Sequence, residues 1–437
     1  MVNLFIKNTL FLTLFLIISC VNGNVCDNAF AKSSERDSRP TEERSGKADS
    51  TKNPVTDAKP AANTEDIIVG ANQTEKYIPL LKGKRVAIIT NPSALLFKSF
   101  PHTKKESTHI VDSLISSGVN VVKVFSPEHG FRGDADAGEK VKDGQDPKTG
   151  LPIISLHGKN KKPTQEQLDG LDVLVFDIQD VGVRFYTYIS TLTYVMEAAA
   201  EKGIPVIVLD RPNPNAHYID GPTLEPENSS FLGMHPVPLV YGMTIGEYAQ
   251  MVIGEQWIDD ADKALLTVIP LGNWTREMKY SLPVRPSPNL PNDTSINLYP
   301  SLGFFEGTHI NAGRGTEMQF QILGSSQLPA EFFPFTYTPQ PNFGSKNPKE
   351  KGKLCQGLDL RTTDYMERVN LEWLIEAYTG YADKANFFKT RSFTLHAGNT
   401  QLQKQIEQGY TFKKIKSTWI KDIENFKKIR TPYLLYQ

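Results

Sequence analysis

Short apolar runs rich in Val and Ile, separated by helical stretches, constrain the fold of this chain more than any other feature of its sequence. The runs lie at residues 85–90, 119–125, 153–156, 173–178, 206–210 and 266–271. Strands that are apolar on both faces and alternate with helices are typical of a parallel sheet covered by helices on both sides. The sequence therefore predicts an α/β fold with a Rossmann-like, doubly wound parallel sheet.

The stretches between these runs carry helical periodicity at residues 109–117, 189–202 and 244–254. In the second stretch, the apolar side chains recur at helical spacing and fall on one face, namely Ile189, Leu192, Val195, Met196 and Ala199. We expect such faces to pack against the sheet.

Polar residues follow several of the predicted strands directly. The segments are Asn91-Pro92, Ser126-Pro127-Glu128-His129, Gln179-Asp180 and Arg211-Pro212-Asn213-Pro214. In an open α/β sheet the ligand crevice lies outside the carboxyl ends of the strands, so these loops should converge on one site. The first predicted strand lacks a G-x-G-x-x-G turn, and the sequence contains no G-x-x-x-x-G-K-[ST] motif. The sheet therefore need not hold a nucleotide, and we expect no cofactor.

After Asn273 the sequence changes to loops rich in Pro, Asn and Ser, and helical patterns return at residues 371–378 and 401–408. We place a domain boundary near residue 295. This gives a Rossmann-like domain at residues 67–295 and a smaller C-terminal α+β domain at residues 296–437 that completes a cleft. Clefts between domains commonly bind ligands.

The first residues are typical of an export signal. Lys7 precedes an apolar run at residues 10–18, which is too short to span a membrane as a helix. The run ends in Ile17-Ile18-Ser19-Cys20, which resembles the lipobox of bacterial lipoproteins. We expect a signal peptide at residues 1–19 and a lipid anchor on Cys20 that holds the exported protein on a bacterial membrane, facing the periplasm. The alternative is a plain secretory signal that contains a cysteine.

Residues 20–66 are predicted to form a disordered tether. From about Ala31 to Asp66 the chain is dominated by small, charged and proline residues and contains no aromatic residue. This composition buries too little apolar surface to offset chain entropy. A flexible segment of this length reaches about 30 to 40 Å on average, which suits an enzyme that works near the bilayer but not in it. The alternative is a disordered N-terminus that does not serve to extend the enzyme away from the membrane.

Charge and cysteine content exclude several classes of protein. The 48 Lys and Arg residues nearly cancel the 49 Asp and Glu residues, and a formal net charge of -1 creates no global field that recruits nucleic acid. The three cysteines, Cys20, Cys26 and Cys355, cannot form a disulfide framework or a four-cysteine zinc site. We therefore expect neither a nucleic-acid partner nor a bound metal.

Several motifs carry a resemblance to a known family. They are SPEHGFRG at residues 126–133, DIQDVGVRFYTYISTL at 177–192, LDRPNP at 209–214, YGMTIGE at 241–247, SLGFFEGT at 301–308 and GRGT at 313–316. In this order they resemble the bacterial exo-β-N-acetylmuramidase family of the NamZ/YbbC-like type, over residues 69–436. The resemblance implies a Rossmann-like domain with a smaller C-terminal domain. It also implies release of N-acetylmuramic acid (MurNAc) from the non-reducing end of peptidoglycan fragments.

Cleavage of a glycosidic bond usually needs a carboxylic acid to protonate the leaving oxygen and a second group that activates water or attacks the anomeric carbon. Glu128 is our candidate for the acid, because it lies just past an apolar strand and partial burial favours the protonated form of a carboxyl group. Its alternative role is to shape the turn at residues 126–130. Glu306 and Asp210 are candidates for the second carboxylate, and each has a structural alternative. The substrate's own acetamido group is a further possible nucleophile.

The lactyl carboxylate of MurNAc suits recognition by a guanidinium group, which binds a carboxylate with two hydrogen bonds. Candidates in the motifs are Arg184, Arg211 and Arg314, each with a structural ion pair to Asp180 or Asp210 as the alternative. His129 is a candidate to orient Glu128 or bind sugar, or else a turn histidine bonded to the backbone. Tyr186 and Tyr188 are candidates to stack on a pyranose ring, with the alternative that one of the two belongs to the core. The remaining candidates for substrate binding are Asn91 and Asn213.

Two other classes of protein fit part of the pattern. A metal-dependent hydrolase could use Glu128, His129 and Asp210, but the sequence contains no H-E-x-x-H motif. A tethered glycan-binding lipoprotein without catalysis would need aromatic platforms and could dispense with Glu128.

Overall fold

The computed structural model describes residues 66–132 and 143–437. The predicted signal peptide, Cys20 and nearly all of the predicted tether lie outside the described residues. The described residues belong to one compact unit. The boundary that we place near residue 295 lies within helix α5 (Asp293–Leu302) and stays a prediction.

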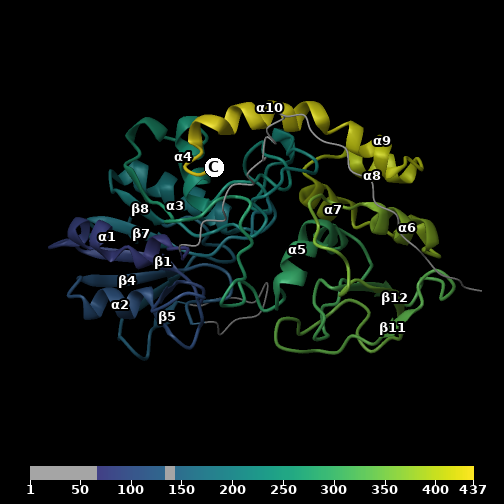
Figure 1. Cartoon of the computed structure of the whole chain (residues 1–437), viewed down its shortest axis with the longest axis horizontal. Helices are drawn as coiled ribbons and strands as arrows, with labels where there is room; N and C mark the ends of the chain where they lie inside the picture. Colours follow the sequence, from purple (N-terminus) through teal and green to yellow (C-terminus); the bar gives the residue numbers. More distant parts are fainter. Residues whose placement is uncertain (1–65, 133–142) are drawn as a thin grey trace, which may run out of the picture. The chain divides into compact units, whose positions relative to one another are not determined.

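The central element is a seven-stranded sheet with the order β5-β6-β4-β1-β7-β8-β9 (Figure 1). Its strands are β1 (Val86–Thr90), β4 (Val121–Ser126), β5 (Gly144–Gln145), β6 (Pro152–Ser155), β7 (Val173–Asp177), β8 (Val206–Leu209) and β9 (Leu266–Ile269). All neighbouring pairs are parallel except β5 with β6. Successive strands run outward from β1 in both directions, so the topological switch point lies between β1 and β7.

Alternate residues of β1 face two separate hydrophobic cores. Val86 and Ile88 join a cluster that includes α1 (Thr74–Leu81) and α2 (Ile110–Ser116). Ala87 and Ile89 join a larger cluster that includes α3 (Tyr188–Lys202) and α4 (Ile245–Gly254). Burial on both faces explains why the strands are apolar at nearly every position. The predicted α/β fold with a doubly wound sheet is confirmed.

The predicted strands and helices match the observed elements closely. Each predicted apolar run contains most or all of one strand, and the three predicted helices of this region are α2, α3 and α4. The face of α3 that carries Ile189, Leu192 and Val195 is buried, as expected. The sequence pattern did not reveal the hairpin of β2 (Leu95–Phe97) and β3 (Ser107–His109) or the antiparallel edge strand β5.

The C-terminal region combines a small antiparallel sheet with helices, as predicted. Its sheet has the order β10-β12-β11, with β10 (Ile322–Ser325), β11 (Phe335–Tyr337) and β12 (Cys355–Asp359). Its further helices are α6 (Glu372–Gly380), α7 (Thr390–Ala397), α8 (Gln401–Glu407), α9 (Phe412–Ser417) and α10 (Ile420–Arg430). The cluster beneath α3 and α4 continues into this region through Phe304, Phe393 and Phe426.

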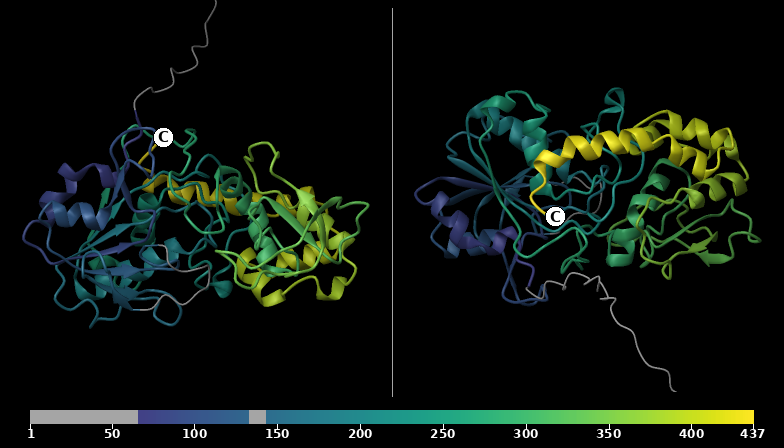
Figure 2. Two further views of the ribbon diagram at one scale, coloured as in Figure 1. Left: turned by 90° about the horizontal axis from the view of Figure 1, so that it is seen from below. Right: turned by 45° about the horizontal axis from the view of Figure 1, so that its top comes forward.

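The last residues return to the first region of the fold. Figures 1 and 2 show α10 running back toward α4. The Tyr436 hydroxyl donates to Asp210 Oδ2 (2.6 Å), and the Leu435 backbone N–H donates to Glu247 Oε1 (2.8 Å). Residues 434–437, which we call the tail, therefore pack beneath the start of α4.

Within the described residues, none of the helices is both long enough and apolar enough to cross a membrane.

Candidate active site

The polar loops at the carboxyl edge of the sheet converge, as predicted. The Gln179 backbone N–H donates to Ser93 Oγ (3.0 Å), which joins the loops after β7 and β1. The Gln179 side-chain amide donates to the Pro212 carbonyl (2.7 Å), which adds the loop after β8. These contacts lie at the switch point, where ligands bind in open α/β sheets.

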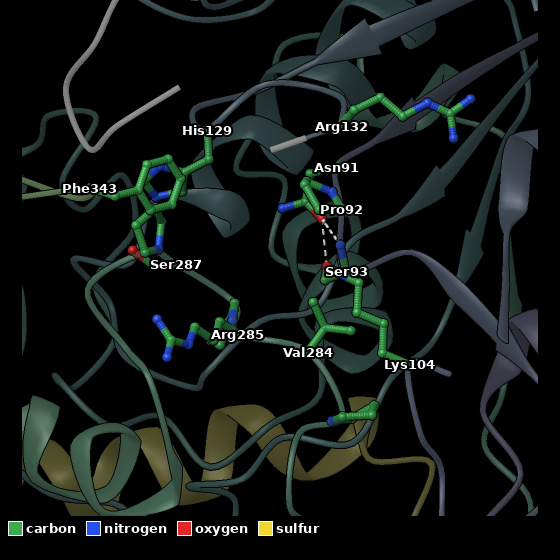
Figure 3. A pocket seen from close by; sticks show the side chains of 13 residues that line it. Asn91, Pro92, Ser93, Lys104, His129, Arg132, Val284, Arg285, Ser287 and Phe343 are labelled. Carbon is green, nitrogen blue, oxygen red and sulfur yellow. Dashed lines mark hydrogen bonds between the residues drawn. The ribbon is translucent and has the colours of Figure 1, made fainter. Parts of the chain in front are cut away.

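A cavity of about 360 Å³ lies at this edge, and Figure 3 shows it. Asn91 and His129, both candidates from the sequence, line it. The other lining residues are Pro92, Ser93, Lys104, Arg132, Pro283, Val284, Arg285, Pro286, Ser287, Pro288 and Phe343. Phe343 comes from the C-terminal region, so both regions contribute to the cavity.

Backbone geometry marks the turn that carries Glu128. His129 adopts a φ of 73° and Gly130 a φ of 78°, in the left-handed region that residues other than glycine rarely occupy. The His129 side chain is buried. Such strain persists only where the surrounding structure over-determines it, and it is common at functional sites. The turn thereby fixes Glu128 and His129 relative to each other.

A second group of polar residues lies next to the cavity, which we call the carboxylate cluster: Glu128, Glu306, Arg314, Tyr188 and Tyr299. The Arg314 Nε donates to Glu306 Oε1 (3.0 Å). Burial and the charges of Glu306 and Glu128 raise the pKa of Tyr299, although Arg314 opposes them. Although burial opposes them, the negative charges of Glu306 and Glu128 also raise the pKa of Arg314. Glu306 and Arg314 are therefore in direct contact, and Glu128 lies within electrostatic range of Arg314 and Tyr299.

Glu306 is held as a carboxylate anion. Burial raises its pKa, but the positive charges of Arg314 and Lys349 outweigh burial and lower the pKa to about 2. The residue lies in a short 3₁₀ helix (Gly303–Gly307), whose carbonyls at Phe305 (2.6 Å) and Glu306 (3.2 Å) accept from Lys349 Nζ. Glu306 therefore carries a negative charge at any physiological pH.

Neither Tyr186 nor Tyr188 is among the described residues that line the cavity. Their rings pack edge to face with centroids 4.9 Å apart, and both residues are buried. The Tyr186 hydroxyl donates to the carbonyl of Pro286, which lines the cavity (2.5 Å). Neither ring presents an open face for a pyranose. Phe343 does, because it lines the cavity while 62% of its surface is exposed.

The structure places Asp210 outside the site. Its Oδ1 accepts from the backbone N–H groups of Arg211 (3.0 Å) and Gly246 (2.8 Å). Its Oδ2 accepts from the hydroxyls of Thr244 (2.7 Å) and Tyr436 (2.6 Å). These donors fill the lone-pair positions of a carboxylate, so Asp210 joins α4 to the tail.

Arg211 and Arg184 are occupied by internal partners. The Arg211 Nε donates to Asp177 Oδ1 (2.6 Å) in a buried ion pair, so its partner is Asp177 rather than Asp180 or Asp210. Arg184 is 0% exposed, and within the described part of the chain its guanidinium donates only to backbone carbonyls, including those of Pro222 (2.7 Å) and Ala397 (2.8 Å). Neither guanidinium reaches the cavity.

Asn213 is also structural, because its amide donates to the Met243 carbonyl (2.8 Å) and its Oδ1 accepts from the Asn215 backbone N–H (2.8 Å). Among the residues that the structure describes, no group of three or more His, Cys, Asp or Glu side chains is placed to hold a metal ion.

Sequence reasoning missed the segment at residues 283–288 and Phe343. The available signal was the proline spacing in Pro283-Val284-Arg285-Pro286-Ser287-Pro288, which stiffens the chain around one exposed arginine. The residue pattern contains nothing that places this segment beside the loops after β1 and β4.

Comparisons with known proteins agree with this architecture. Family models described as the N-terminal and C-terminal parts of the exo-beta-N-acetylmuramidase NamZ match residues 86–294 and 297–436. The peptidoglycan beta-N-acetylmuramidase NamZ of Bacillus subtilis (strain 168) is 41% identical over 379 residues, covering 82% of this chain and 89% of that protein.

Two solved structures of DUF1343 family proteins from Bacteroides fragilis are also similar. One has 42% identity and a TM-score of 0.77, and the other has 31% identity and a TM-score of 0.73. Each alignment covers 85% of this chain and 99% of the other chain. Since the family models and the Bacillus relative both span most of the chain, this protein belongs to the NamZ family of exo-β-N-acetylmuramidases.

Proposed function

We propose that this protein is a glycoside hydrolase that releases MurNAc from the non-reducing ends of peptidoglycan fragments. The similarity to the Bacillus enzyme over most of both chains supports the substrate class. The observation that carries the chemistry is the carboxylate cluster, in which Glu128 and Glu306 act on the same arginine, Arg314. Two carboxyl groups at one site are what glycoside hydrolysis usually requires.

The two carboxyl groups have different tasks. Glu306 has a pKa near 2, so it does not deliver a proton at neutral pH. Its fixed negative charge stabilises the positive charge that develops at the anomeric carbon. Glu128 is the proton donor for the leaving oxygen, held in place by the strained turn at His129. Either Glu306 or the substrate's acetamido group attacks the anomeric carbon.

A defined disaccharide tests this function. The soluble domain, residues 66–437, should release free MurNAc from MurNAc-GlcNAc, which product chromatography detects. A chain whose non-reducing end is capped by N-acetylglucosamine should resist cleavage, because an exo-acting enzyme needs a free terminal MurNAc. Cleavage of internal bonds in the capped chain at an equal rate would contradict exo action, and absence of free MurNAc from the disaccharide would contradict the function.

The sequence also supports a location for this activity. We propose that the protein is exported, anchored to a bacterial membrane through a lipid on Cys20, and faces the periplasm. The lipobox-like Ile17-Ile18-Ser19-Cys20 and the tether composition at residues 20–66 support this proposal. Peptidoglycan fragments would then lie within the reach of the tethered enzyme.

A further inference from the structure

We infer that Arg285 binds the lactyl carboxylate of MurNAc and thereby selects this sugar over N-acetylglucosamine. The inference rests on the proposed function, because it takes the ligand to be a MurNAc-terminated saccharide. It concerns the cavity at the carboxyl edge of the sheet, which Arg285 lines together with His129, the residue that follows Glu128.

The other arginines near the site are already paired. Arg184 and Arg211 are buried, and Arg314 bonds Glu306. Arg132 lines the cavity, but its guanidinium contacts Asp112 (3.1 Å) and Asp146 (2.8 Å). Figure 3 shows this guanidinium pointing away from the other labelled side chains.

Arg285, by contrast, is exposed, and its side chain makes no hydrogen bond or ion pair with any residue that the structure describes. Lys104, which is also exposed, lines the cavity as a second cation. Among the described residues that line the cavity, none has a carboxylate side chain. The cavity therefore attracts an anionic group, and a guanidinium can bind a carboxylate through two parallel hydrogen bonds.

The backbone that directly follows Arg285 is fixed by hydrogen bonds. The carbonyl of Pro286 accepts from Tyr186 (2.5 Å), and the carbonyl of Ser287 accepts from the Leu290 backbone N–H (3.0 Å). The Asn289 amide donates to the Gly344 carbonyl (2.7 Å), which ties this segment to the loop that carries Phe343. Arg285 and the exposed Phe343 ring are thus held on two connected loops, one suited to the carboxylate and the other to the apolar face of the pyranose.

MurNAc differs from N-acetylglucosamine by its lactyl ether, so the carboxylate is the group that a selective site must recognise. The test compares free MurNAc with its methyl ester, which keeps the shape of the sugar but removes the charge. Titration calorimetry with the wild-type soluble domain should show about 10 to 100-fold tighter binding of the acid, the range expected for a charge-assisted hydrogen-bonded pair.

Arg285→Gln should bind the acid and the ester equally, and Arg285→Lys should recover part of the preference because it restores charge without the planar fork. Arg391→Gln is the matched control, since Arg391 is an exposed arginine of α7 that does not line the cavity. It should keep the full preference. Unchanged melting temperatures check that the variants fold.

Retention of the full preference by Arg285→Gln overturns the inference. If Lys104→Gln loses the preference for the acid over the ester while Arg285→Gln keeps it, the inference is also overturned and recognition is assigned to the lysine. The result is independent of catalysis. If the wild-type protein binds MurNAc selectively but releases none from the disaccharide, the proposed function fails and the assignment of Arg285 stands.

Discussion

At the residue scale, the two carboxyl groups of the carboxylate cluster have different surroundings. Glu306 is surrounded by cations and bonded to Arg314, whereas Glu128 lies on a strained turn whose next residue, His129, lines the cavity. Glycosidases commonly use such a pair, in which one carboxyl group stays ionised and the other transfers a proton. The assignment of Glu128 as the acid leads to a test based on the leaving group.

Glu128→Gln removes the transferable proton from a side chain of nearly the same shape. We expect kcat on MurNAc-GlcNAc to fall by about 10² to 10⁴-fold, with a smaller change in KM. A nitrophenyl muramide has a weakly basic leaving group that hardly needs protonation, so the variant should retain far more of its activity on this substrate. Steady-state kinetics on both substrates measure the difference.

Equal losses on the two substrates would move Glu128 to the role of nucleophile or charge stabiliser. Activity unchanged on both would make the residue structural.

Residue types at strand ends predicted the location of the site better than they predicted its members. Glu128, His129 and Asn91 lie at or beside the cavity, whereas Asp210 and Arg211, at the end of β8, face partners inside the protein. A residue just past a strand points either into the crevice or back toward the next helix, and the sequence does not encode that choice locally. Arg285 was missed because its place depends on contacts between distant segments.

At the scale of elements, Asp210 connects β8 to the start of α4. A Cβ atom on Gly246 would lie 2.7 Å from Asp210 Cγ, so the first turn of the helix approaches the carboxylate as closely as a glycine permits. Burial raises the pKa of Asp210 to about 6, although hydrogen bonds from Tyr436 and Thr244 favour the charged form. The carboxyl group of Asp210 therefore changes its protonation state within a pH range in which protein stability can be measured.

Asp210→Asn should fold, because its amide oxygen can accept from the two backbone N–H groups while its NH₂ group donates to the two hydroxyls. The raised pKa means that the folded wild-type protein binds more protons than the unfolded chain. Asp210 therefore stabilises the folded wild-type protein fully below about pH 4, and this stabilisation is lost as the pH rises through about 6.

The melting temperature of the variant relative to the wild type should therefore rise between pH 4 and pH 6, as measured by calorimetry. We also expect kcat within a few-fold of the wild type. A flat difference across this range, or a large loss of kcat, would argue against this role of Asp210.

The sequence predicted well those elements whose apolar residues follow a clear strand or helix pattern. Strands β1 and β7 are apolar throughout because they are buried on both faces, and α3 is long enough to show its period clearly. Strands β2, β3 and β11 have only three residues each, too few to establish an alternating pattern. Helix α5 contains Pro300, and the sequence predicts loops in this region instead.

At the scale of the whole molecule, the tail joins the end of the sequence to the central sheet. Tyr436→Phe removes the bond to Asp210 and leaves the buried Leu271 N–H without its acceptor. We expect a loss of about 1 to 3 kcal/mol in the free energy of unfolding, measured by denaturant titration. Removal of residues 434–437 should cost more, because Glu247 also loses its bonds to the tail.

Leu435→Ala is a suitable control, since this side chain is 40% exposed and its backbone N–H remains in place. A loss as large as that of Tyr436→Phe would mean that apolar packing, rather than hydrogen bonding, holds the tail.

The proposed anchor is also a property of the whole molecule. Cys20→Ala should move the protein from the membrane to the soluble periplasmic fraction, because the lipid has no other attachment point in the proposal. Cys26→Ala should leave the protein on the membrane and serves as the control. Fractionation followed by immunoblotting measures both. Retention of the Cys20 variant on the membrane would rule out the lipobox interpretation.

The bond between Asp210 and Tyr436 joins residues that are 226 positions apart in the sequence. At ordinary rates of translation, roughly 10 to 45 s separate the synthesis of these two residues. Throughout that interval the junction of β8 and α4 lacks a donor that it will later bury. Although the sheet is encoded in the first part of the chain, the hydrogen bonds of Asp210 are therefore completed only after synthesis has passed residue 436.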